Sequence, residues 1–128
     1  MMLIKTYVAP SPISGVGVFS AEFVAKGAKL WEIHPRFDLT FTPADIDKLP
    51  ESMKDFFATY SYRFAAQPDA VMVNLDNSRF MNHTLDANTN FAQFNTGWAV
   101  RDIQPGEELT CNYHEFDPTF AGAFEVAR

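Results

Sequence analysis

Cysteine is nearly absent from this sequence, which has a single one, Cys111, among 128 residues. One cysteine cannot form an intramolecular disulfide, and it cannot supply a cysteine-rich zinc site. The chain also lacks an apolar run near the ~18 residues of a membrane span, and its first residues lack the pattern of a secretory signal peptide. We therefore expect an intracellular, cytoplasmic protein with no bound metal and no membrane partner.

Clusters of positive charge are also missing. Ten basic residues are scattered among sixteen acidic ones, and the net charge is -6. Phosphate backbones are bound by clustered cations, so direct binding of nucleic acid is not expected. An acidic surface would attract a basic protein or peptide, although the same charge can serve solubility alone. Phosphate-binding loops, Gly-x-Ser-x-Gly nucleophile turns and His-Glu-x-x-His zinc helices are absent as well.

Aromatic residues are abundant instead, at 15% of the chain with 13 Phe. They can build a dense core, and they can line a cleft for a flat or cationic ligand; the two roles are compatible. The length fits one domain, residues 1–128, because a chain of this size buries roughly 65–70% of its unfolded surface.

Short β-strands with tight connections are predicted along most of the chain. They are expected at residues 2–9, 16–19, 29–33, 70–74, 90–95, 98–103 and 108–111. Gly97 is expected to form the hairpin turn between two of them. An aromatic tail, about residues 114–128, carries Phe116, Phe120 and Phe124.

A helical insertion is predicted over about residues 43–62. Thr42 is a favourable N-cap, Pro43 suits the first turn, and Asp45 would lie at the positive end of the helix dipole. Pro50 interrupts the segment, so two helices are expected.

Three short segments are candidates for chemistry. Gly15-Val16-Gly17 lets the backbone turn sharply or approach a ligand closely. Residues 79–84 group an amide, an imidazole and a hydroxyl that could bind the polar edges of a small ligand. Tyr113, after a turn and a strand, could orient a nucleophile through its hydroxyl. Taken singly, each is better explained by structure, as a β-turn, a buried Asn–His pair and a half-buried tyrosine.

Taken in order, these segments resemble a SET domain, the fold of many protein lysine methyltransferases. The resemblance covers most of the chain and includes residues 24–27, Asn88 and residues 103–110. It implies a mainly β (α+β) fold of small curved β-sheets with a short helical insertion. It also implies a C-terminal segment that threads through a loop like a knot, which is rare in proteins.

The resemblance further implies methyl transfer from S-adenosylmethionine to a lysine side chain of a basic protein or peptide. The residues that would bind the cofactor are Gly15, Val16, Gly17, Arg79, Phe80, Asn82 and His83, with Asn88 in support. Tyr113 would be catalytic, and Cys111, Phe116 and Tyr62 would line the substrate channel. The alternative is a catalytically inactive SET-like module that binds a basic peptide or the cofactor. A homodimer is compatible with either, and association with chromatin would follow from a histone or histone-like substrate.

The sequence departs from the family pattern at several positions. Thr84 and Leu85 stand where many members have Ser and then Cys, and Ala87 stands where Pro is common. Asn112 replaces the usual Asp, although it can still hydrogen-bond. A cysteine-rich zinc tail is missing from these residues, so Phe116 or Phe120 is expected to cover the site, or to pack in the core.

Cys111 precedes Tyr113 by two positions, where the family often has Phe or Tyr whose bulk helps set how many methyl groups the lysine accepts. Cysteine is smaller and a weak hydrogen-bonder. The resemblance therefore predicts room for more than one methyl group.

Overall fold

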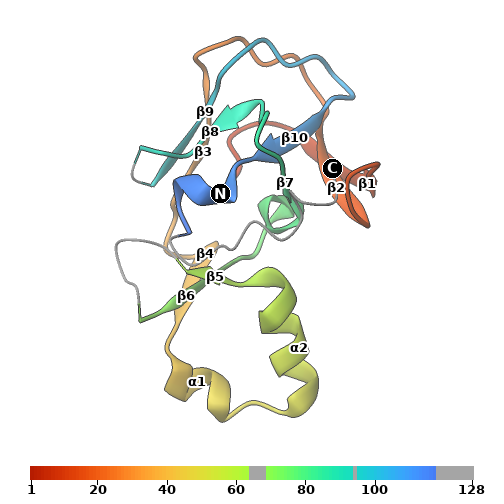
Figure 1. Ribbon diagram of the computed structural model, residues 1–128. Coiled ribbons are helices and arrows are strands. Elements are labelled where there is room, and N and C mark those ends of the chain that lie inside the picture. Colours follow the sequence, from red (N-terminus) through yellow and green to blue (C-terminus); the bar gives the residue numbers. More distant parts are fainter. Residues whose placement is uncertain (64–68, 94, 118–128) are drawn as a thin grey trace.

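Three small β-sheets and two short helices form the protein in a computed structural model that describes residues 1–63, 69–93 and 95–117 (Figure 1). The mainly β fold with a helical insertion is confirmed. Most of the aromatic tail, with Phe120 and Phe124, lies outside the described residues, and the knot-like threading stays a prediction. Neither helix within these ranges has the length and apolar character that crossing a bilayer requires.

The first sheet has four strands in the order β1-β2-β10-β7. Its members are β1 (Thr6–Pro10), β2 (Val16–Ser20), β10 (Glu108–Cys111) and β7 (Asn82–His83). β10 runs antiparallel to β2 and parallel to β7, so it is hydrogen-bonded on both edges. β1 and β2 form a hairpin, closed by a hydrogen bond from the Ser11 amide to the Gly15 carbonyl at 2.9 Å.

The other two sheets have three strands each. One contains β3 (Lys29–Glu32), β9 (Thr96–Ala99) and β8 (Thr89–Asn90); the other contains β4 (Asp38–Phe41), β6 (Val71–Asn74) and β5 (Tyr62–Arg63). β4 and β5 were not predicted, and β5 is only two residues long. Two 3-10 turns, η1 (Asn77–Phe80) and η2 (Tyr113–Glu115), come just before β7 and just after β10.

The predicted helical insertion consists of α1 (Pro43–Asp47) and α2 (Glu51–Tyr60), and it follows β4. Thr42 caps α1 in a capping box: its hydroxyl accepts from the Asp45 amide at 3.2 Å, and the Asp45 carboxylate accepts from the Thr42 amide at 2.9 Å. Figure 1 shows both helices at one end of the molecule, joined to the rest through β4 and β5.

The prediction of a hairpin turn at Gly97 is wrong, because Gly97 lies inside β9. A Cβ atom there would come within 2.5 Å of the Phe91 ring, so the absence of a side chain at Gly97 lets this ring pack against the sheet. The chain reverses earlier, at Asn95, whose φ of 61° is in the left-handed region that Asn tolerates. Consequently β8 ends and β9 begins before the predicted positions.

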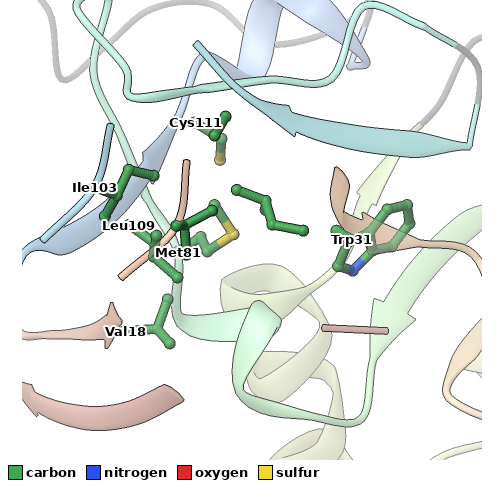
Figure 2. Packing of buried hydrophobic residues seen from close by; sticks show 9 residues of the cluster. Val18, Trp31, Met81, Ile103, Leu109 and Cys111 are labelled. Atoms are coloured by element: carbon green, nitrogen blue, oxygen red, sulfur yellow. The ribbon is translucent and has the colours of Figure 1, made fainter. Parts of the chain in front are cut away.

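Buried apolar side chains from the first two sheets meet in one core cluster. Figure 2 shows Val18, Met81, Ile103 and Leu109 packed together, with Trp31 on the opposite side of the cluster. Leu30, Ile103, Leu109 and Val18 are fully buried. Each such side chain contributes about 1.5–3 kcal/mol when removed from water.

A buried asparagine just before β8 connects this part of the chain to β10. Asn88 donates through Nδ2 to the Glu108 carbonyl at 2.8 Å, and its Oδ1 accepts from the Thr110 amide at 3.0 Å. Its backbone amide donates to the Thr110 hydroxyl at 3.2 Å. Asn88 therefore supports β10 directly, through both polar atoms of its side chain.

Replacing Asn88 by Ala should lower the free energy of unfolding by about 2–4 kcal/mol, because it leaves two buried backbone groups of β10 without partners. Urea denaturation followed by circular dichroism measures the change. Asn90→Ala is the matched control: its Oδ1 accepts one bond, from the Ala92 amide in an exposed turn, so the loss should be about 1 kcal/mol or less. Equal losses in the two variants would contradict the role of Asn88.

Candidate active site

A cavity of about 130 Å³ lies between η2, the end of β10 and the segment that follows α2. Its lining includes all four residues expected to be catalytic or to line a substrate channel, which are Tyr113, Cys111, Phe116 and Tyr62. Other lining residues are Trp31, Met72, Asn74, Arg79, Met81 and Phe91. No local pattern in the sequence indicated the contribution of Trp31, Met72 and Phe91, which come from separate parts of the fold.

Tyr113 is held at both its backbone and its hydroxyl. Its amide donates to Nδ1 of His83 at 3.0 Å, and its hydroxyl donates to the Met81 carbonyl at 2.6 Å. Asn112 caps the 3-10 turn by accepting from the His114 amide at 3.0 Å. Burial raises the pKa of the Tyr113 hydroxyl above its ordinary value. The side chain is therefore a neutral hydrogen-bonding group at physiological pH.

His83 lies behind Tyr113 and does not line the cavity. The residue is 3% exposed, and its ring centre is 5.1 Å from that of Tyr113. Because Nδ1 accepts a hydrogen bond, the neutral ring carries its proton on Nε2. The parallel pairing of β7 with β10 sets His83 opposite Cys111. This position brings the His83 ring to the Tyr113 backbone amide.

Cys111 forms part of the cavity wall and is also a member of the core cluster (Figure 2). Its side chain is buried, and Sγ lies 3.9 Å from the Asn82 carbonyl. Burial raises the pKa of the Cys111 thiol. Nucleophilic cysteines need a lowered pKa, so burial and the raised pKa favour a role for Cys111 in shaping the cavity.

An aromatic wall completes the cavity. The Phe116 ring lies 5.1 Å from Tyr62, 5.8 Å from Phe91 and 5.8 Å from Tyr113, measured between ring centres. The Tyr62 hydroxyl contacts the Met72 sulfur at 3.1 Å, and burial raises the pKa of Tyr62. Phe116 lines the cavity and also packs against the core cluster, so whether it covers a bound ligand stays a prediction.

Arg79 brings a positive charge to the cavity lining, and its guanidinium lies over aromatic rings. The guanidinium carbon is 4.8 Å from the Phe80 ring centre, 5.5 Å from Tyr60 and 5.8 Å from Phe56. Its Nε is buried and has no hydrogen-bond partner among the described residues. An unpaired buried donor is costly in a folded protein, so Nε is available to an acceptor such as a carboxylate.

Asn82 and the glycine segment form a second cluster, outside the cavity lining. Asn82 Nδ2 lies 3.2 Å from both the Ser14 and Val16 carbonyls, and 2.9 Å from the Glu108 carboxylate. The amide nitrogen is thus used within the protein. Gly15 has a φ of 46°, with open space beside it, and Val16 is 43% exposed.

Sequence reasoning missed two members of this cluster, Ser11 and Glu108, whose side chains bond each other at 2.8 Å. They are 97 positions apart, so no local pattern joins them. Of the residues expected to bind the cofactor, Arg79 lines the cavity. Gly15, Val16, Gly17 and Asn82 lie in the second cluster, Phe80 packs on Arg79, and His83 supports Tyr113. Within the described residues, no three His, Cys, Asp or Glu side chains come together to hold a metal.

One comparison, with models of protein families, identifies a family for this chain. The model of the SET domain matches residues 15–114. No curated protein sequence matches significantly. Among solved structures, a Plasmodium falciparum protein described as a candidate histone methyltransferase is similar, with a TM-score of 0.59 and 19% identity over 88% of this chain and 95% of its own.

Two larger assemblies contain similar chains. An active polycomb repressive complex 2 in the basal state gives a TM-score of 0.62 and 21% identity over 86% of this chain. A humanized Chaetomium thermophilum complex of the same kind, bound to an inhibitor, gives 0.61 and 21% over 91%. This chain spans 15% and 16% of the length of those two chains. At such identities the likeness concerns the fold.

Replacing Tyr113 by Phe should reduce the amplitude of the latest part of the alkaline titration of the four tyrosines, to which Tyr62 also contributes. Burial raises the pKa of Tyr113 above the ordinary tyrosine value of about 10, so this residue ionises late in the titration. The folded state holds this proton more tightly than the unfolded chain, so the related stability is fully present below about pH 10 and is lost as the pH rises through the folded pKa.

The ultraviolet absorbance of tyrosinate, recorded against pH, measures the alkaline titration of the wild type and of the variant. Tyr62→Phe should have the same effect, because burial also raises the pKa of Tyr62. Loss of amplitude near the ordinary tyrosine pKa in the Tyr113→Phe variant would show that its hydroxyl is not buried as described.

Proposed function

This chain belongs to the SET-domain family, and we propose that it transfers a methyl group from S-adenosylmethionine to a lysine side chain of a basic protein. The observation that carries the proposal is the cavity in which Tyr113, Cys111, Phe116 and Tyr62 meet. These are the residues that the family resemblance assigns to catalysis and to the lysine channel.

The size of the cavity suits a lysine side chain. Its volume is about 130 Å³, and an apolar cavity of about 150 Å³ can hold benzene. Four methylenes and an amine occupy a comparable space. The whole cofactor is much larger, so it would extend beyond this cavity along neighbouring segments.

The charges around the cavity favour an uncharged amine. A lysine with a pKa of about 10.4 is neutral in only ~0.04% of molecules at pH 7, yet the nucleophile must be neutral. Among the described lining residues no Asp or Glu is present, and Arg79 is positively charged. Both desolvation and a like charge lower the pKa of an amine. The substrate lysine would therefore lose its proton to solvent as it enters.

Tyr113 suits an orienting role. Its raised pKa makes it a poor general base near neutral pH. As a neutral hydroxyl, held between Met81 and the aromatic wall, it can fix the direction from which the amine approaches. Alignment at near-attack distance is the main contribution that such a site can make.

The residues present fit the cofactor in two respects. The unpaired Nε of Arg79 can donate to the carboxylate of its methionine part. The open backbone at Gly15 and Val16 leaves room for close approach, and Asn82 would contribute its backbone and Oδ1. Together with Gly17, Phe80 and His83, these residues would hold the cofactor. When bound, S-adenosylmethionine supplies an electrophilic methyl group on a positively charged sulfur.

The substrate is proposed to be a basic protein, because the chain carries a net charge of -6. The structural relatives include a protein described as a candidate histone methyltransferase, which makes histones and histone-like proteins the first acceptors to test. We propose a cytoplasmic enzyme, with chromatin association if the acceptor is of that kind.

Tyr113→Phe should lower the rate of methyl transfer about 100-fold or more, because a misplaced nucleophile costs that much. Cofactor affinity should stay within about twofold by calorimetry. The assay follows labelled methyl groups from S-adenosylmethionine into core histones and into a soluble lysate of the source cell. Tyr7→Phe, at an exposed tyrosine stacked on Phe19, is the matched control and should be fully active.

A wild type that binds S-adenosylmethionine without methylating any acceptor would instead identify an inactive SET-like module. Absence of both binding and transfer would refute the proposal.

Enlarging Cys111 should restrict the number of methyl groups added. The wild type is expected to place more than one methyl on the same lysine, because a thiol leaves room beside Tyr113. Cys111→Phe should shift the product toward monomethyl-lysine, whereas Cys111→Ser, the size-matched control, should not. Mass spectrometry of the methylated acceptor measures the distribution. Monomethylation alone by the wild type, unchanged in both variants, would disprove the role of Cys111.

A further inference from the structure

Glu108, which the site described above does not use, lies at the centre of a hydrogen-bonded cluster. Its carboxylate oxygens are 2.8 and 2.9 Å from the Ser11 hydroxyl, and one of them is 2.9 Å from Asn82 Nδ2. The residue is half-buried at the first position of β10. Hydrogen bonds to a charged acceptor are about twice as strong as neutral ones, so this carboxylate dominates the cluster.

The position of the Glu108 carboxylate also accounts for the glycine at position 17. A Cβ atom built on Gly17 would lie 2.9 Å from the Glu108 Cδ and 3.1 Å from the Ser11 Cβ, closer than real contacts allow for the first of these. The φ of Gly17 is not in the left-handed region. A side chain at position 17 would therefore force the Glu108 carboxylate to move, independently of any ligand.

The same cluster holds the loop of residues 11–17, called here the glycine loop. The Ser11 hydroxyl accepts from the Ile13 amide at 3.0 Å while it donates to Glu108. Asn82 Nδ2 is shared between Glu108 and the carbonyls of Ser14 and Val16. The carboxylate thus connects β10 to Ser11 directly, and to Ser14 and Val16 through Asn82.

Glu108 also contributes to the orientation of the Asn82 amide. An ionised carboxylate only accepts hydrogen bonds, so Nδ2 must face it and Oδ1 must face away. Together with the Ser14 and Val16 carbonyls, which also only accept, the carboxylate therefore leaves Oδ1 of Asn82 for a ligand.

We propose that Glu108 is a positioning residue for the cofactor site: it fixes the glycine loop and the Asn82 amide in the arrangement that receives S-adenosylmethionine. This inference rests on the proposed function. It predicts that loss of the carboxylate weakens cofactor binding and leaves the acceptor side of the cavity unaffected, because Glu108 does not line that cavity.

The first test measures binding and kinetics in Glu108→Ala and Glu108→Gln. We expect Glu108→Ala to weaken S-adenosylhomocysteine binding about tenfold or more, the worth of one charge-assisted hydrogen bond. KM for the cofactor should rise in parallel, and KM for the acceptor protein should stay within about twofold. Glu108→Gln, which keeps the shape and one acceptor, should be intermediate. Glu107→Ala removes the neighbouring carboxylate, which is outside this cluster, and should behave as the wild type.

The second test combines Glu108→Ala with Gly17→Ala. If the carboxylate occupies most of the space at Gly17, the methyl group that Gly17→Ala adds should weaken cofactor binding more in the wild-type background than in the Glu108→Ala background, where only the Ser11 Cβ contact at 3.1 Å remains. A loss of the same size in both backgrounds would overturn the inference, because the ligand itself would then require the glycine.

The third test needs no cofactor, so it separates this inference from the proposed function. In the protein without ligand, Glu108→Ala should speed hydrogen exchange at the Ile13 amide, whose acceptor Ser11 loses its anchor. Protection at Leu109 in the core should not change. Unchanged exchange in the glycine loop would refute the positioning role even if methyl transfer occurs, and faster exchange would support it even if no methyl transfer is found.

Discussion

The pairing of β10 with two strands of opposite direction is the constraint on which the rest of the site depends. Antiparallel pairing with β2 brings Glu108 beside the glycine loop, and parallel pairing with β7 brings Cys111 opposite His83. Successive side chains of a strand point to opposite faces. Leu109 and Cys111 accordingly enter the core, while Glu108 and Thr110 meet asparagines on the other face. One strand of four residues therefore joins the core, the cavity and the glycine loop.

Two asparagine side chains, Asn88 and Asn82, add hydrogen bonds that connect β10 to segments outside its own sheet pairing. The Asn88 side chain makes the hydrogen bonds that the backbone of a neighbouring strand would make, because it offers both a donor and an acceptor to β10. Asn82 links the hairpin turn to β10, because its Nδ2 is shared among the Ser14 and Val16 carbonyls and the Glu108 carboxylate. Serine or aspartate could supply only part of these bonds, so the two amides allow small sheets to pack closely while their backbone groups stay paired.

Features determined by near neighbours in the chain could be predicted from the sequence, whereas features set by distant contacts could not. The capping box at Thr42 and the boundaries of β10 follow from residues within one turn or one strand. Gly97 was misassigned because the Phe91 ring that requires it comes from outside its own strand. In the same way, the polar types at Asn82 and His83 indicated a site, but their directions depend on Glu108 and Tyr113, far along the chain.

The lining of the cavity carries few charges among its described residues. Burial raises the pKa of Tyr113, Tyr62 and Cys111, so each of these groups stays neutral near physiological pH. Arg79 is then the one formal charge among the described lining residues. A site of this kind stabilises a neutral amine, and its described lining offers no ionised group with which to remove a proton. Its contribution to methyl transfer would come from excluding water and aligning the reactants, and alignment in turn depends on the strand that carries Cys111 and leads into Tyr113.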